Sequence, residues 1–163
     1  MLSFNVVLHE PEIPDNTGAV GRTCVAVGAR LFLVQPLGFQ IDSRRIARAG
    51  MDYWQHLDYQ VAVDWSDLRS RVSGRYWYFT KRGSVLYSDV CYEAGDVFVF
   101  GCETRGLPDY ILSGVPPENK VRIPTRPEAR SLNISVSVAV ALYEAQRQLI
   151  YSKTNLPNTT GNF

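Results

Sequence analysis

The fold of this chain is decided by one stretch of its sequence, DVFVFGCETRGLP, which covers residues 96–108. The valines and phenylalanines at 97–100 predict a short strand buried on both faces, which ends at Gly101. An acid (Glu103), a base (Arg105) and a second glycine (Gly106) follow. Glycines let a ligand approach the backbone closely, although this spacing is neither the G-x-G-x-x-G dinucleotide motif nor a P-loop. The stretch therefore predicts a buried strand that leads into a candidate binding loop.

Outward from this strand, short apolar runs alternate with amphipathic stretches in both directions. We predict strands over 4–8, 29–34, 59–63, 75–80, 96–100 and 121–124. We predict helices over 16–28, 43–49, 64–72, 108–112 and 131–150. Asp15 or Asn16 is expected to cap the first helix and Asp64 the third. This order predicts a single α/β domain over 1–163, with a mainly parallel sheet, helices on both faces and a loose polar tail over 154–163.

Ligands of such sheets bind beyond the carboxyl ends of the strands, which indicates the loops after Thr80, Phe100 and Ile123. The last of these loops is stiffened by prolines and leads into a helix at Ser131, whose free N–H groups could receive a ligand. That helix is apolar nearly all round. It is therefore expected to be buried, either in the core or at a subunit interface.

The segment PDNTGAVGR at 14–22 is another candidate for a functional role. Gly18, Arg22 and Ala26 share one face of the predicted helix. Small residues around an arginine leave room for a ligand or a second backbone. They equally suit tight helix packing with Arg22 in a structural ion pair, and the pattern alone favours this interpretation.

Composition narrows the class of protein. Apolar residues make up 45% of the chain, no apolar run is long enough to span a bilayer, and the first residues do not form a secretory leader. The cysteines, Cys24, Cys91 and Cys102, form no C-x-x-C pair, which favours a reducing cytosol over a disulfide framework or a zinc site. Net charge is only +1, but arginine supplies 14 of the 17 basic residues. Arginine suits phosphates and stacks on bases, although an arginine-rich solvated surface is an equal alternative.

Cys102 also raises the hypothesis of a small cysteine hydrolase. Such an enzyme needs a base beside the thiol, and the only histidines, His9 and His56, are distant in sequence. A buried structural cysteine is the favoured interpretation.

Three motifs in order carry a family resemblance: NTGAVGR at 16–22, FGCETRGL at 100–107, and IP at 123–124 followed by SLNIS at 131–135. Together they resemble the SPOUT class of RNA methyltransferases. LHEPEIPDNTG at 8–18, RRIARAGMDYW at 44–54 and ETRGLP at 103–108 are similar to the TrmL branch, which methylates the wobble cytidine or uridine of tRNA. The resemblance covers about residues 3–150.

This resemblance implies a homodimer whose C-terminal segment forms a trefoil knot, an exception to the near absence of knots in proteins. The knot would hold S-adenosylmethionine, without a metal, through Phe79, Thr80, Gly101, Gly106, Ile123, Ser131 and Leu132. It assigns a catalytic role to Arg22, reaching toward the partner's cofactor, and to Asn16, Glu103 and Asn133. Ser135 and Tyr143 match further motif positions near the site.

The implied reaction is attack of a ribose 2′-oxygen on the cofactor methyl, in the anticodon loop of cytoplasmic tRNA, with leucine tRNAs as the expected substrates. The family assigns proton removal to the arginine that matches Arg22. Since arginine normally stays protonated, the alternative is that it positions a phosphate or stabilises the forming oxyanion. The residues expected to bind RNA are Arg44, Arg45, Arg48, Arg126 and Arg130. Other possibilities are an enzyme of this class acting on ribosomal RNA or another tRNA position, and a non-catalytic RNA-binding module.

Overall fold

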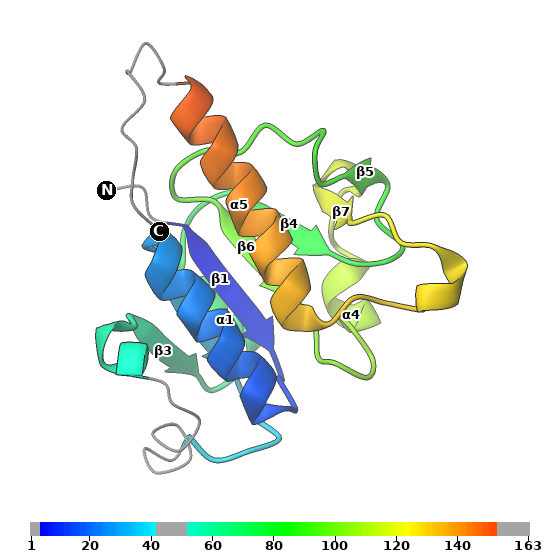
Figure 1. Ribbon diagram of the computed structural model, residues 1–163. Coiled ribbons are helices and arrows are strands. Elements are labelled where there is room, and N and C mark those ends of the chain that lie inside the picture. The colour runs from blue at the N-terminus through cyan, green and yellow to red at the C-terminus, as the bar shows by residue number, and fades with distance from the viewer. Residues whose placement is uncertain (1–3, 42–51, 153–163) are drawn as a thin grey trace.

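The computed structural model describes residues 4–41 and 52–152, which form a parallel sheet covered by helices (Figure 1). The strands are β1 (Asn5–His9), β2 (Arg30–Val34), β3 (Tyr59–Ala62), β4 (Tyr76–Phe79), β5 (Val85–Leu86), β6 (Val97–Phe100) and β7 (Lys120–Arg122). They are ordered β3-β2-β1-β6-β4-β7-β5, and every pairing between them is parallel. The central strand β6 is the one predicted from the stretch at 96–108, and all four of its residues are buried.

Helices lie on both faces of the sheet, as predicted. The α-helices are α1 (Pro14–Val27), α3 (Trp65–Arg71), α4 (Asp109–Leu112) and α5 (Ile134–Ser152). Shorter 3₁₀ turns are η1 (Asp52–His56), η2 (Pro117–Asn119) and η3 (Pro127–Ala129). Helices α1 and α5 lie side by side over one face (Figure 1). The side chains of α3 and α4 pack into a second core on the other face.

The alternation of side chains along β6 explains the two cores. Phe98 and Phe100 belong to the core under α1 and α5, whereas Val97 and Val99 belong to the core under α3 and α4. Successive residues of a strand point to opposite faces, so a strand that is apolar at every position can supply both cores. This is why the DVFVF run places β6 in the middle of the sheet rather than at its edge.

Several predicted boundaries are wrong by a few residues. The first helix begins at Pro14, and neither Asp15 nor Asn16 caps it: Ile13 is at the N-cap and makes no side-chain cap bond. Proline suits the first helical position because its φ is already helical and it lacks an N–H. The predicted cap of the third predicted helix is confirmed, because the Asp64 side chain accepts a hydrogen bond from the Asp67 N–H at 2.8 Å.

The C-terminal helix begins at Ile134 rather than at Ser131. Asn133 immediately precedes the helix, and its Oδ1 accepts bonds from the Ser135 N–H at 2.8 Å and the Ser135 hydroxyl at 2.6 Å. This side chain takes the place of a preceding helical turn, as N-cap residues do. Short elements without strong periodicity were not predicted, namely β5 and the 3₁₀ turns, and the predicted helix over 43–49 lies outside the described residues.

Helix α5 is not buried all round in the single chain. Ile134, Val138, Ala141, Leu142 and Ala145 are in the core, but Val136, Tyr143 and Ile150 are about half exposed. These three follow at intervals of seven residues, so they share one face of the helix. Among the described residues, no helix is both long and apolar enough to cross a membrane.

Candidate active site

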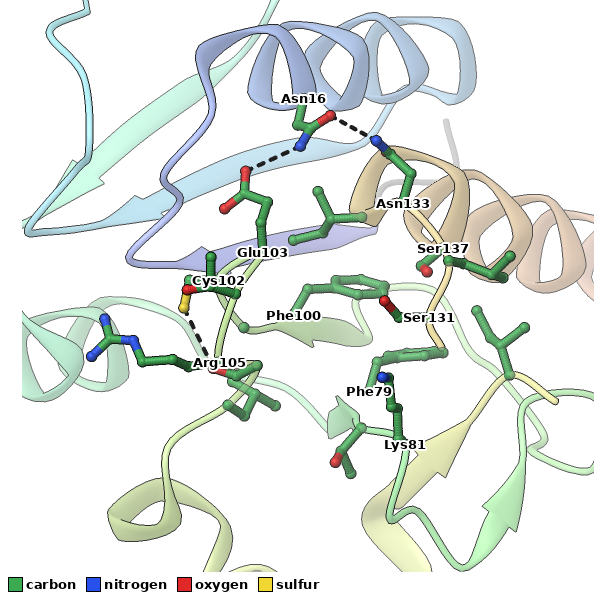
Figure 2. A pocket seen from close by; sticks show the side chains of 18 of the residues that line it. Asn16, Phe79, Lys81, Phe100, Cys102, Glu103, Arg105, Ser131, Asn133 and Ser137 are labelled. Carbon is green, nitrogen blue, oxygen red and sulfur yellow. Dashed lines mark hydrogen bonds between the residues drawn. The ribbon is translucent and has the colours of Figure 1, made fainter. Parts of the chain in front are cut away.

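A cavity of about 660 Å³ lies beyond the carboxyl ends of β4, β6 and β7 and is closed above by the starts of α1 and α5 (Figure 2). The three loops chosen from topology line it together. The seven residues predicted to contact the cofactor all line it: Phe79, Thr80, Gly101, Gly106, Ile123, Ser131 and Leu132. Asn16, Glu103 and Asn133 line it as well. Residues up to 117 positions apart in the sequence thus meet in one place.

The floor of the cavity is apolar and tightly packed. Phe79 at the end of β4 stacks on Phe100 at the end of β6, with ring centroids 4.6 Å apart. Directly after Phe100 the chain doubles back, and Cys102 pairs with Gly106 in a short antiparallel bridge. A Cβ at position 101 would overlap the backbone of Gly106 and Leu107, so only glycine fits. Gly106 itself has φ of +69°, a conformation that other residues rarely adopt.

Glu103 connects this loop to the segment before α1. Its carboxylate accepts bonds from the backbone N–H groups of Glu12 at 2.8 Å and Ile13 at 3.0 Å. The Asn16 amide donates a third bond to it at 3.3 Å (Figure 2). The Ile13 N–H is at the N-cap of α1 and has no partner within the helix, so Glu103 supplies the anionic acceptor that local residues do not. Arg105, which is close to Glu103 in the sequence, is near Glu10 instead.

The loop receives a second set of bonds from Glu12, a residue that sequence reasoning missed. The Glu12 carboxylate accepts from the Thr104 N–H at 3.1 Å and the Thr104 hydroxyl at 2.8 Å. Arg105 lies 3.6 Å from Glu10. The two segments 10–13 and 103–105 thus bind each other reciprocally. The paired acids of HEPEIP were the only available signal, and they do not reveal a partner about 90 residues away.

Asn16 and Asn133 complete the upper side of the cavity. The Asn133 Nδ2 donates to the Asn16 Oδ1 at 2.9 Å, and Asn16 in turn donates to Glu103. Figure 2 shows this chain of side chains running from the binding loop to the start of α5. All three motifs are therefore joined by hydrogen bonds across the cavity mouth.

Arg22 is exposed on α1 and does not line the cavity of its own chain. It makes no ion pair with any residue of the described ranges, so the structural ion pair favoured by the pattern is not found there. Its guanidinium carbon lies 5.8 Å from the centroid of the Tyr53 ring. The Tyr53 hydroxyl donates to the Gly18 carbonyl at 2.6 Å. The small residues of α1 thus accommodate η1, and Arg22 remains accessible.

The predicted RNA-binding residues divide into two groups. Arg126 and Arg130 are exposed on the segment between β7 and α5, whereas Arg44, Arg45 and Arg48 lie outside the described residues. Arg130 has φ of +57° and ψ of −58°, and the Ser131 N–H donates to the Ala129 carbonyl at 2.6 Å across it. This is a γ-turn of the rare and strained hand. Such strain in a non-glycine residue often accompanies a functional site.

The Cys102 thiol lacks the base that a hydrolase would need. Cys102 is buried, and its sulfur lies 3.9 Å from the Gly106 carbonyl oxygen. His9 is hydrogen-bonded to Tyr110 and His56 to Gln55, so neither histidine serves Cys102. Within the described part of the chain, no group of three or more His, Cys, Asp or Glu residues is placed to hold a metal ion.

The fold and the cavity define the class of protein, and comparison with known families agrees. The chain belongs to the SpoU rRNA Methylase family, whose profile matches residues 3–143. This membership confirms the predicted class of enzyme, an RNA ribose 2′-O-methyltransferase that depends on S-adenosylmethionine.

The names of similar proteins specify the RNA and the nucleotide that those proteins methylate. A tRNA (cytidine(34)-2′-O)-methyltransferase of Methylovorus glucosotrophus is 47% identical over 146 residues, which is 89% of this chain and 95% of that protein. The protein of the same name from Escherichia coli K12 is 44% identical, covering 91% and 95%. A solved structure on 2-OH methylation of C or U at position 34 of tRNA superposes with a TM-score of 0.85 at 39% identity, covering 91% and 97%. An AdoMet-bound rRNA methyltransferase of Sinorhizobium meliloti gives a TM-score of 0.79 at 26% identity, covering 90% of this chain and 57% of that one.

Proposed function

We propose that this chain methylates the ribose 2′-hydroxyl of the wobble nucleotide, a cytidine or modified uridine, in the anticodon loop of cytoplasmic leucine tRNAs. The observation that carries the proposal is that all three motifs meet at one cavity. The relatives named for position 34 of tRNA support the choice of nucleotide over a ribosomal target. The preference for leucine tRNAs rests on the family resemblance alone.

The cavity residues fit S-adenosylmethionine. Phe79, Phe100, Ile123 and Leu132 offer apolar surface for a nucleoside, and Leu132 is unusually exposed for a leucine at 37%. Thr80 and Ser131 add hydroxyl groups, and Gly101 and Gly106 bring the backbone close. When bound, the cofactor supplies a methyl group made electrophilic by its sulfonium. We expect no metal in the site.

We further propose that the enzyme is a homodimer whose site is completed across the interface. Arg22 is outside the cavity of its own chain, yet the motif that contains it also supplies Asn16 to that cavity. The exposed face of α5 formed by Val136, Tyr143 and Ile150 is apolar, as a subunit interface requires. Pairing through this face would let Arg22 approach the partner's cavity.

The proposed trefoil knot is supported by the strand order. β7 pairs with β4 on one side and with β5 on the other, although β5 follows β4 directly in the sequence. The chain must therefore pass β7 into the gap left between two earlier neighbours. Gly83 permits this close passage, because a Cβ there would overlap the backbone of Val121 and Arg122.

The protein residues have distinct roles in the proposed mechanism. The Glu103 carboxylate already accepts three hydrogen bonds, so it holds the loop and Asn16 rather than removing the substrate proton. Arg22 from the partner stabilises the negative charge that develops on the 2′-oxygen as the hydroxyl proton passes to solvent water. Asn16 and Asn133 fix the edge of the cavity where the ribose enters. Much of the rate enhancement then comes from holding the reacting atoms in line.

The test is transfer of labelled methyl from S-adenosylmethionine to tRNA lacking the modification, followed by nuclease mapping. We expect a 2′-O-methyl group at the wobble nucleotide of leucine tRNAs, and a loss of at least about a hundredfold in kcat for Arg22→Ala. Arg30→Ala is the matched control, since Arg30 is exposed and pairs with Asp58 at 2.6 Å, away from the cavity. A mark on ribosomal RNA or at another tRNA position would contradict the proposed substrate. RNA binding without transfer would favour a non-catalytic module.

A further inference from the structure

Three basic side chains on the rim of the cavity were not among the predicted site residues. Lys81 and Arg82 follow β4, and Arg105 lies in the binding loop after β6. All three are exposed. The only carboxylate lining the same cavity within the described ranges is Glu103, and its oxygens are occupied by the Glu12, Ile13 and Asn16 donors. The rim therefore carries positive charge that the cavity itself does not neutralise.

This charge exceeds what the cofactor can use. S-adenosylmethionine has one carboxylate, and its sulfonium and ammonium groups are positive, so further cations are unfavourable to it. A polyanion satisfies several cations at once, and nucleic-acid phosphates are the anions that arginine and lysine bind in groups.

An exposed aromatic ring continues this rim. Tyr110 is 64% exposed, which is high for a tyrosine, and it is the second residue of α4. Its neighbour Asp109 bonds Arg82 at 2.9 Å. In Figure 2 the Arg105 side chain points away from the aromatic floor of the cavity. It extends toward Glu10, the neighbour of His9, and His9 is in turn hydrogen-bonded to Tyr110.

The Tyr110 ring is held in position although the residue is largely exposed. Its hydroxyl is hydrogen-bonded at 2.9 Å to Nε2 of His9, which is only 2% exposed. The His9 and Tyr110 rings also meet edge to face, with centroids 6.1 Å apart. Burial lowers the pKa of His9, so the imidazole is neutral at physiological pH and the bond does not depend on a charged partner. A fixed, exposed aromatic ring loses little conformational entropy when a planar group stacks on it.

We propose that Lys81, Arg82, Arg105 and Tyr110, together termed the α4 rim, bind single-stranded RNA next to the nucleotide in the cavity. The cations bind backbone phosphates, and the Tyr110 ring stacks on a neighbouring base. Cationic side chains interleaved with an exposed aromatic ring are the combination that binds single strands. This inference rests on the proposed function, since the α4 rim would supply contacts that bind the anticodon loop.

The acidic groups beside the rim do not oppose this assignment. Asp109 is 87% exposed in its pair with Arg82, and Glu10 lies 3.6 Å from Arg105. Burial is the main cause that raises the pKa of the Tyr110 hydroxyl, and the charges of Glu10 and Asp64 raise it further. Exposed ion pairs contribute little to stability, so the arginines can exchange a carboxylate for a phosphate at small cost.

The test measures the affinity of the full-length protein for an unmodified anticodon stem-loop and for an unstructured RNA oligomer, across a range of salt concentrations. We expect Tyr110→Ala to weaken binding about five- to hundredfold. Tyr110→Phe, which keeps the ring but loses the His9 bond, should retain most of the affinity. The double variant Lys81→Ala/Arg82→Ala should weaken binding and lower the slope of log K against log salt by about 0.7 for each lost phosphate contact. Arg30→Ala should change neither quantity.

Cofactor affinity, measured by calorimetry with S-adenosylmethionine, separates the rim from a damaged site. Tyr110→Ala should bind the cofactor like the wild type, and a parallel loss of cofactor and RNA binding would overturn the assignment. Unchanged RNA affinity and salt slope in all variants would also overturn it. If the variants lose affinity for the oligomer while the wild type methylates another nucleotide, the α4 rim stands and the proposed wobble substrate fails.

Discussion

The two walls of the cavity are built in different ways. The loop 101–107 is bound on both sides: Glu103 and Thr104 exchange bonds with the segment before α1, and Cys102 pairs with Gly106. The segment 123–133 projects from the body (Figure 1) and is mostly exposed. It is connected to the first wall indirectly, because Asn133 donates to Asn16 of α1 and Asn16 donates to Glu103. One wall is thus preorganised by tertiary contacts, whereas the other relies on prolines and a strained turn. The first property suits a cofactor pocket, and the exposure of the second wall leaves it accessible to RNA.

The largest effect should come from the preorganised wall at Gly101. Gly101→Ala places a methyl group on the backbone of Gly106 and Leu107, which cannot move aside. We expect a loss of about 3 kcal/mol or more in the free energy of unfolding by urea, with loss of cofactor binding. Gly106→Ala meets no atom within 4 Å but has φ of +69°, so it should cost only about 1 kcal/mol. Gly114→Ala is the control, and equal stability of the Gly101 and Gly114 variants would contradict this description.

Glu103 tests whether the wall depends on its contact with α1. Glu103→Ala leaves the N–H groups of Glu12 and Ile13 without their acceptor, so we expect a loss of about 2 kcal/mol in unfolding free energy. The dissociation constant for S-adenosylmethionine should rise as the loop loosens. Glu103→Gln keeps one acceptor oxygen and should recover part of both effects, whereas Glu118→Ala, at an exposed position, should leave both unchanged. A Glu103→Ala protein with wild-type cofactor affinity would show that the contact is dispensable.

The second wall, over 123–133, should respond in the opposite sense at Arg130. Arg130→Gly relieves the strained γ-turn, and after the larger entropy of glycine in the unfolded chain we expect a net gain of about 1 kcal/mol. Arg126, with φ of −70°, is unstrained, so Arg126→Gly should lower the melting temperature. Thermal unfolding of both variants measures the difference in sign. A fall in melting temperature for both would mean that the turn stores no strain.

The smallest effect concerns His9, behind the preorganised wall. Burial is the main cause that lowers the pKa of His9 below its ordinary value of 6.5. The unfolded chain therefore binds a proton at higher pH than the folded chain does. The contribution of His9 to the free energy of unfolding is fully present above about pH 6.5. It is lost as the pH falls toward the lower pKa of His9 in the folded chain. Denaturation of wild type and His9→Gln at pH 7.5 and 5.5 should show a smaller pH dependence in the variant, and identical dependence would exclude His9 as the cause.

Much of the fold followed from local patterns. The apolar run at 97–100 placed β6 at the centre of the sheet, and Asp64 capped α3 as expected, because its partner is only three residues away. The three cavity loops were also predictable, since strand ends in a parallel sheet share one edge. The starts of the helices at Pro14 and Ile134 were not predictable. Glu103, about 90 residues away, accepts the backbone N–H bonds before Pro14, and the Asn133 side chain caps the helix that begins at Ile134.

The sequence by itself determined the class of the fold, the central strand, and the motif residues that gather at the cavity. The fold class and the central strand depend on periodicity and on neighbours within a few residues, which a linear pattern records, whereas the motif residues were indicated by the resemblance to a known family. Only the tertiary structure decided that β7 lies between β4 and β5, that Glu12 and Glu103 bind the opposite segment, and that Arg22 is outside its own cavity. It also decided that Asp109, the neighbour of Tyr110, bonds Arg82 and that the Tyr110 ring is fixed by His9. These features depend on which distant segments become neighbours, and packing of the whole chain sets that choice.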